Sequence, residues 1–230
     1  MALQQEKLYK ILGANGEATN GGTGKWFLPH GKRPGKWMPK IKGDLIPCEN
    51  GYHLCRKQDL IHWLGPSLWE AEYRGDRVDA DDKIVVREAR VLRQVEIWND
   101  KTARLFACDC AEYALGFVKN PDPRSVEAVR VVRLFAIGEA TNEELDAASV
   151  AASAAAWPAR DAASAAAWPA AGVAASAAAI AAARAAARAT WDAAKATARD
   201  ARATWDAWDA ARAWMTKRLF QYLDGEVGYD

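Results

Sequence analysis

The stretch LWEAEYRGDRVDADDKIVVREARVL (68–92) decides the fold class of the N-terminal half. Two of its runs, LWEAEY (68–73) and KIVVREARVL (83–92), are rich in the β-branched and aromatic residues that are typical of strands. Asp79, Asp81 and Asp82 lie between them and predict an acidic turn. Working outward, we expect three further strands, at LYKIL (8–12), KWF (25–27) and GYHLC (51–55).

A short amphipathic helix is predicted between the strands, in RKQDLIHWLG, where Gly65 and Pro66 end it. Strands interrupted by a helix indicate a mixed α/β domain, here residues 1–98. From Asp100 the apolar residues recur with the period of a helix, so residues 99–230 are expected to form a second domain. The predicted fold class is α+β, a mixed α/β domain followed by an alanine-rich α-helical bundle or coil.

Helical periodicity predicts amphipathic helices in TARLFACDCAEYALGFV and SVEAVRVVRLFAIGEA, with a capped third helix beginning at TNEEL (141–145). The expected apolar positions of the first two helices are Leu105, Cys108, Ala111, Leu115, Val126, Val129 and Val132. The octapeptide AASAAAWP then occurs at 151–158 and again at 162–169. Because proline removes a helical hydrogen bond, we expect breaks or kinks at both Trp-Pro pairs.

No helix breaker occurs between Gly172 and Gly225, and apolar residues there follow two heptad seams. One seam ends at Met215 and Tyr222, and the other runs through Trp205 to Leu219. This spacing predicts a long alanine-rich helix with tryptophans in the gaps that alanine leaves, and a homodimer is compatible with it.

Charge and cysteine usage limit the classes of function. The 31 Lys and Arg nearly balance the 30 Asp and Glu, so nucleic-acid binding would have to come from a local patch. The four cysteines are too few for a disulfide scaffold and are expected to be reduced. The first residues lack the apolar core of a signal peptide, and the alanine tracts carry regular charges, so we expect a cytoplasmic protein without a membrane segment.

The segment 25–42, KWFLPHGKRPGKWMPKIK, is basic and aromatic and contains no acidic residue. Cations displace counterions from phosphates, and flat rings stack on unpaired bases, so this composition favours a single-stranded or flipped nucleic acid. The alternative is a solvated loop with two core tryptophans. The candidate nucleic-acid-binding residues are Lys25, Trp26, Lys32, Arg33, Lys36 and Trp37.

Other chemistry finds less support. Cys48, His53, Cys55 and His62 are ligand types for zinc, but no C-x-x-C pair is present, so no metal site is expected. The sequence has neither the G-x-S-x-G elbow of hydrolases nor the phosphate-binding loop of kinases.

Two resemblances extend this interpretation. RLFACDCAEYAL, DPRSVEAVRVVRLFAIGEATNEELDAAS and the alanine repeats resemble alanine-rich bacterial immunity proteins. With GKWMPK and NGYHLCR ahead of them, the whole arrangement resembles an uncharacterised family of actinobacteria and their phages. The order LYKILG, GYHLC, RKQDLIHW, LWEAEYRGD and DDKIVVREARVL resembles the ADP-ribosyltransferase fold of the polymerase type.

The second resemblance implies NAD as a substrate. Lys10 falls where that family has its NAD-binding His, with His30 as another candidate, and Tyr52 or His53 falls at the ring-stacking position. The catalytic carboxylate would be Asp82, at the family's glutamate position, or Glu88. His53 is accordingly counted with both the catalytic and the cofactor-binding candidates.

Two hypotheses follow. In the first, the protein breaks the nicotinamide glycosidic bond of NAD and places ADP-ribose on a nucleic-acid base held by the 25–42 segment. In the second, the protein is a non-enzymatic immunity or counter-defence protein, and its alanine- and tryptophan-rich helices capture a protein partner.

Overall fold

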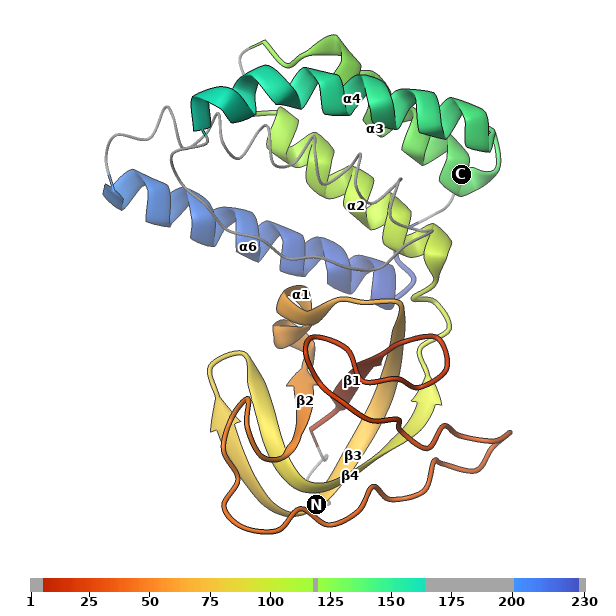
Figure 1. Cartoon of the computed structure of the whole chain (residues 1–230), viewed down its shortest axis with the longest axis vertical. Coiled ribbons are helices and arrows are strands. Elements are labelled where there is room, and N and C mark those ends of the chain that lie inside the picture. Colours follow the sequence, from red (N-terminus) through yellow and green to blue (C-terminus); the bar gives the residue numbers. More distant parts are fainter. Residues whose placement is uncertain (1–5, 118–119, 164–200, 228–230) are drawn as a thin grey trace. The chain divides into compact units, whose positions relative to one another are not determined.

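The computed structural model describes residues 6–117, 120–163 and 201–227 of the 230-residue chain (Figure 1). It is a mixed α+β protein, which confirms the predicted class at that level. By its contacts the chain forms two compact units, one of residues 1–99 with Leu223–Gly225 and one of residues 100–222 with 226–230. Each unit is described below by itself.

The first unit is built around four antiparallel strands that close on themselves in the order β1-β2-β4-β3. A 3-10 turn, η1, and a short helix, α1, follow β2 (Figure 1). The elements are β1 Leu8–Leu12, β2 Tyr52–Arg56, η1 Lys57–Asp59, α1 Leu60–Trp63, β3 Ser67–Ala80 and β4 Lys83–Gln94.

Strands β3 and β4 form one long hairpin. Along β4 the core residues change from even-numbered positions near the turn to odd-numbered positions farther along. Ile84 and Val86 are fully buried near the turn, whereas Ala89 and Val91 are the buried residues farther along β4. The change coincides with a register shift at which the two residues between Arg74 and Arg77 oppose a single residue of β4. Gly75, one of those two residues, has a φ of +79°, the left-handed conformation that glycine adopts without strain in such bulges.

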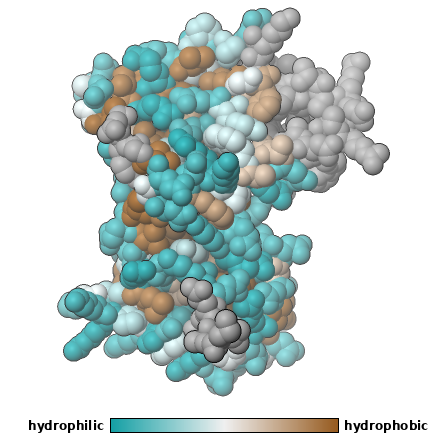
Figure 2. All heavy atoms as spheres, turned by 180° about the vertical axis from the view of Figure 1, so that it is seen from behind, coloured by the Kyte–Doolittle hydropathy of each residue, from teal (hydrophilic) through white to brown (hydrophobic). Residues whose placement is uncertain are grey.

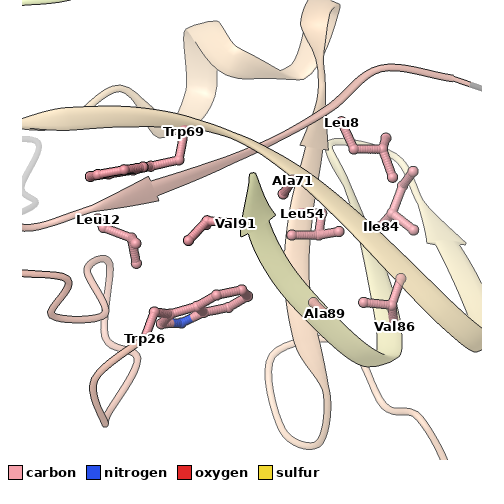
Figure 3. Close-up of a cluster of buried hydrophobic side chains, with 10 residues drawn as sticks. All are labelled: Leu8, Leu12, Trp26, Leu54, Trp69, Ala71, Ile84, Val86, Ala89 and Val91. Carbon is pink, nitrogen blue, oxygen red and sulfur yellow. The ribbon is translucent and has the colours of Figure 1, made fainter. Parts of the chain in front are cut away.

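The core of this unit fills the space that the strands enclose. Figure 3 shows Trp26 with its indole directed toward the strand side chains. Its ring meets Tyr52 edge to face, with 5.4 Å between centroids. The buried members are Leu8, Leu12, Trp26, Leu54, Trp69, Ala71, Ile84, Val86, Ala89 and Val91.

The predicted strand KWF (25–27) is wrong. Lys25 forms an isolated bridge with Glu17, and the rest of the segment has no ladder. Farther along the same loop, the backbone N–H groups of Gly35, Met38 and Ile41 donate to carbonyls of β4, from Val91 to Arg87. The segment therefore occupies the edge of β4 beyond the point where β2 stops pairing, at Tyr52 and Val86.

The second unit contains α2 Asp100–Leu115, α3 Pro123–Ile137, α4 Asn142–Ala163 and α6 Ala201–Leu223. Thr141 and Glu144 form the predicted capping box, because each side chain accepts a hydrogen bond from the other residue's backbone N–H. Of the predicted apolar positions, Leu105, Cys108, Ala111, Val129 and Val132 are buried, whereas Val126 is 46% exposed.

A break or a kink was expected at Trp157-Pro158. The break is wrong, because α4 continues through this pair to Ala163, and the kink stays a prediction. A proline removes one hydrogen bond from the helical ladder, and the rest of the ladder persists on either side. The second Trp-Pro pair and most of the predicted alanine-rich seam fall between residues 164 and 200, outside the described residues.

A buried carboxylate connects three helices of this unit. Asp109 of α2 accepts hydrogen bonds from Arg133 Nη2 of α3, at 2.8 Å, and from Arg218 Nε of α6, at 2.6 Å. The Tyr222 hydroxyl donates to the same carboxylate at 2.8 Å, and burial together with this bond raises the pKa of Tyr222. No local sequence pattern indicates this role for Asp109.

On the face drawn in Figure 2, hydrophilic residues dominate the described surface, with hydrophobic residues interspersed. No helix within the described ranges has both the length and the apolar character needed to cross a bilayer.

Candidate functional site

A cavity of about 280 Å³ opens in the first unit beside β1 and β2. The two strands pair only at Leu8 with Arg56 and at Tyr9 with Cys55, and the pairing stops there. The cavity is lined by Lys10, Ile11, Thr19, Asn20, Gly21, Gly22, Cys48, His53, Cys55, Trp63 and Lys83. Two of these residues are lysines, and none of the described lining residues is acidic.

Lys10 holds the two strands together where the ladder stops. Its Nζ donates a hydrogen bond to the His53 carbonyl at 3.1 Å and lies 4.9 Å from the centroid of the buried Trp26 ring. One side of the ammonium thus faces an aromatic ring, an arrangement that partly compensates a cation for lost water. Burial is the main cause that lowers the pKa of Lys10 to about 8.

His53 is oriented by the loop before β2. The backbone N–H of Cys48 donates to His53 Nε2 at 3.0 Å, so the neutral ring carries its proton on Nδ1. Cys48 adopts a φ of +68°, which is uncommon for a residue other than glycine. Burial, followed by the charges of Lys10 and Lys83, lowers the pKa of His53, and the ring is therefore neutral at physiological pH.

The cavity lining also includes Trp63 and Lys83, which both contact Asp82. The Trp63 indole N–H donates to the Asp82 carbonyl at 2.9 Å, and Lys83 Nζ lies 4.5 Å from the Trp63 ring centroid. The Asp82 carboxylate contacts Lys83 Nζ at 3.1 Å. Although burial opposes it, this carboxylate contributes to a net rise in the pKa of Lys83, which keeps its charge at neutral pH.

The two cysteines of the cavity differ in character. Cys55 is buried, and burial raises the pKa of its thiol to about 12, so it is a poor nucleophile. Cys48 is exposed. Although Cys48, His53 and Cys55 all line the cavity, no group of three His, Cys, Asp or Glu in the described ranges is placed to hold a metal ion.

The loop of residues 19–22 forms one wall of the cavity and is anchored to both neighbouring elements. Thr19 Oγ1 donates to the Ile11 carbonyl at 3.4 Å, and the Asn20 side-chain amide donates to the Trp63 carbonyl at 3.4 Å. Gly21 and Gly22 of this loop line the same cavity as the two amines.

The structure brings together only some of the NAD-binding candidates. Lys10 and His53 both line the cavity, and Asp82 lies behind Lys83. Tyr52 points to the other face of β2, where its hydroxyl donates to the Pro39 carbonyl at 2.7 Å. His30 is exposed in an isolated bridge with Arg33, away from the residues that line the cavity.

Glu88 occupies a different environment from Asp82. Its Oε2 accepts two hydrogen bonds from Arg74, from Nη2 at 2.6 Å and from Nε at 3.0 Å. The carboxylate is therefore engaged in an ion pair with Arg74. Glu88 is not among the residues that line the cavity.

Trp26 and Trp37 of the 25–42 segment are occupied by contacts within the unit, whereas Phe27 is 46% exposed. Trp26 is 5% exposed and belongs to the core. Trp37 is half-buried, with the guanidinium groups of Arg74 and Arg90 at 4.4 and 4.6 Å from its ring. The exposed basic candidates are Lys25, Lys32, Arg33 and Lys36.

Sequence reasoning missed Lys83, Trp63, Cys48 and the 19–22 loop as partners in one site. One signal in the sequence could have indicated it. Lys10 is a cation within an otherwise apolar strand, LYKIL, and a lysine at such a position needs either a partner or a function. Pairing of distant segments brings the other residues to it, and no local pattern reports that pairing.

The fold and the cavity define a small closed antiparallel β-unit that carries a cationic pocket. Comparison with protein-family models, with curated proteins and with solved structures finds no match to this chain. The residues of the pocket are therefore the available indication of function.

Proposed function

We propose that the first unit is a nucleotide-binding module and that its pocket takes a phosphate-bearing aromatic ligand. The observation that carries the proposal is the presence of two lysine amines in one cavity whose described lining residues include no acid. Phosphate oxygens are acceptors only, and ammonium groups are donors only, so the lining matches a phosphate in both charge and hydrogen bonding.

The rest of the lining suits a flat ring. Trp63 is a half-buried indole in the cavity wall, and Ile11 adds apolar surface. Small-molecule pockets commonly span roughly 300–1,000 Å³, so a cavity of about 280 Å³ lies at the lower end of that range. This volume favours a mononucleotide, or one half of a dinucleotide such as NAD.

NAD is the first ligand to test, because the proposal extends from nucleotide binding to catalysis if the pocket supports ADP-ribosyl transfer. Such a transfer needs a carboxylate to stabilise the positive charge that develops on the ribose. We favour Asp82, which does not itself line the cavity, because its carboxylate contacts Lys83 of the lining and its carbonyl accepts from Trp63. The basic residues of the 25–42 segment would then receive the nucleic acid.

The binding test compares AMP, NAD and inorganic phosphate with the uncharged nucleoside adenosine, using calorimetry on the full chain. We expect AMP to bind and adenosine to bind at least tenfold more weakly, because a hydrogen bond to a charged group contributes about 1.5–3 kcal/mol. Lys10→Met and Lys83→Met should each weaken AMP binding by a similar factor. Lys36→Met, a change at an exposed lysine, is the control and should bind like the wild type.

Equal affinity for AMP and adenosine, or unchanged AMP affinity in both pocket variants, would refute the proposed phosphate site. Catalysis is tested separately by release of nicotinamide from NAD, with and without single-stranded DNA or RNA. Asp82→Asn removes the negative charge, so it should abolish release of nicotinamide. Because it keeps the side-chain shape, AMP should still bind. Release at the wild-type rate in this variant would exclude Asp82 as the catalytic carboxylate.

The alternative, capture of a protein partner by the alanine- and tryptophan-rich helices, stays a prediction. Most of the seam on which it depends lies between residues 164 and 200. Its expected signature is partner binding that survives Lys10→Met and Lys83→Met together.

A further inference from the structure

We propose that Lys10 forms an imine with a carbonyl group of the anionic ligand bound in this pocket. The inference rests on the proposed phosphate site and adds a covalent step to it. It identifies the ligand class as phosphate-bearing aldehydes or ketones, and it gives the two lysines different roles.

The position of the amine carries this inference. Lys10 Nζ is held by a single hydrogen bond, to the His53 carbonyl, and by the Trp26 ring, and it lines an open cavity at the same time. An amine fixed by a carbonyl keeps its lone pair available when it is neutral, because the carbonyl only accepts. A carboxylate partner would instead hold the amine as an ammonium ion.

The surroundings of the two amines separate their protonation states. Lys10 interacts with Cys55 and His53 of β2, whereas Lys83 of β4 lines the same cavity and contacts Asp82. Desolvation lowers the pKa of Lys10 to about 8, so a substantial fraction is neutral near physiological pH. Lys83 contacts Asp82 and has a raised pKa, so it remains a cation that can hold the phosphate.

The step balances without a further reactant. The neutral amine attacks the carbonyl carbon, and the electron pair of the C=O π bond moves to oxygen. A proton passes from nitrogen to that oxygen, which gives a carbinolamine. Loss of the hydroxyl group with a second proton, as one water molecule, leaves the C=N bond. Desolvation is a recognised way to activate a lysine for this chemistry.

The experiment uses pyridoxal 5′-phosphate as the probe, followed by borohydride reduction and peptide mapping by mass spectrometry of the full chain. Pyridoxine 5′-phosphate, which has the phosphate and ring but no aldehyde, measures binding alone. We expect Lys10 to carry most of the reduced label and excess AMP to suppress it. In Lys10→Arg, which keeps the positive charge, pyridoxine phosphate should still bind and the label should disappear.

The pH profile distinguishes a pocket amine from a surface amine. At saturating probe, labelling of Lys10 should rise with pH and level off above a midpoint near 8, whereas an ordinary lysine keeps rising toward about 10.4. Lys36→Arg, at an exposed lysine outside the cavity lining, is the matched control and should leave labelling at Lys10 intact.

The outcomes separate the two proposals. If pyridoxine phosphate does not bind, the phosphate site itself is wrong, and the imine falls with it. If pyridoxine phosphate binds but the aldehyde labels surface lysines as much as Lys10, the imine proposal is overturned while the phosphate site stands. If the peptide that contains position 10 still carries the label in Lys10→Arg, another amine of that peptide reacts, and the assignment to Lys10 is overturned.

Discussion

Replacing Asp109 with alanine should destabilise the helical unit more than any other single loss of a carboxylate in its described part. Asp109 is 7% exposed and accepts hydrogen bonds from Arg133, Arg218 and Tyr222. The substitution leaves two guanidinium groups facing each other and a tyrosine hydroxyl without its acceptor. The expected loss combines these effects.

The magnitude follows from how much water each partner can regain. The side chains of Arg133 and Arg218 are 33% and 30% exposed, so each of these bonds is expected to contribute only about 1 kcal/mol. Tyr222 is 2% exposed, and a buried hydroxyl left without a partner costs about 1–3 kcal/mol. We therefore expect Asp109→Ala to lower the free energy of unfolding by about 3–5 kcal/mol.

The assay is urea unfolding of the full chain followed by far-ultraviolet circular dichroism, with hydrogen exchange across α2 as a local measurement. Tyr222→Phe alone should cost about 1 kcal/mol. The double variant should be less destabilised than the two single changes predict together, because no hydroxyl remains to be left unpaired. Asp146→Ala, at an exposed position of α4, is the control and should stay within about 0.5 kcal/mol of the wild type.

A loss below about 1 kcal/mol for Asp109→Ala, or strict additivity in the double variant, would refute the reasoning. The first result would mean that solvent replaces all three hydrogen bonds. The second would mean that the hydroxyl of Tyr222 finds another partner when the carboxylate is absent.

Three further predictions concern the first unit. Lys10→Met should raise the free energy of unfolding by about 1–2 kcal/mol at pH 7, because it removes the cost of burying a charged amine. In the wild type this cost is complete below the folded-state pKa of about 8 and vanishes as the pH rises toward the usual 10.5. The unfolding free energies of variant and wild type should therefore converge near pH 10. In the native protein iodoacetamide should react first with the exposed Cys48, since burial raises the pKa of the other three thiols to about 12. AMP should slow this reaction if it fills the cavity. Equal rates at all four thiols would contradict the burial of the other three. Gly35→Ala should destabilise by about 3 kcal/mol or more, because its Cβ would lie 1.9 Å from the Phe27 carbonyl oxygen, while Lys36→Ala beside it should be neutral by thermal unfolding.

Local patterns were enough to predict most of the elements. The runs at 8–12, 51–55, 68–73 and 83–92 lie within or largely overlap strands, and RKQDLIHWLG contains η1 and α1. Helical periodicity places α2 and α3, and the capping sequence TNEEL marks the start of α4. These signals are local because side-chain alternation and capping involve residues only a few positions apart.

The same patterns misjudged segments whose conformation is set by distant partners. KWF was predicted to be a strand because its residues suit one, yet Trp26 is a core side chain on a loop. Trp37 suggested base stacking, but the guanidinium groups of Arg74 and Arg90 lie over its ring. A sequence window does not contain the residues that make these contacts.

The sequence by itself determined the α+β class, the change of period near Asp100 and the presence of a lone cation in the strand LYKIL. Only the tertiary structure decided that β1 and β2 stop pairing at Tyr9 and Cys55, leaving Lys10 to bind the His53 carbonyl beside a cavity. The reason is that strand register and closure are fixed by pairing between segments far apart in the chain. Such pairing brings residues 10, 53 and 83 together, although no spacing in the sequence relates them.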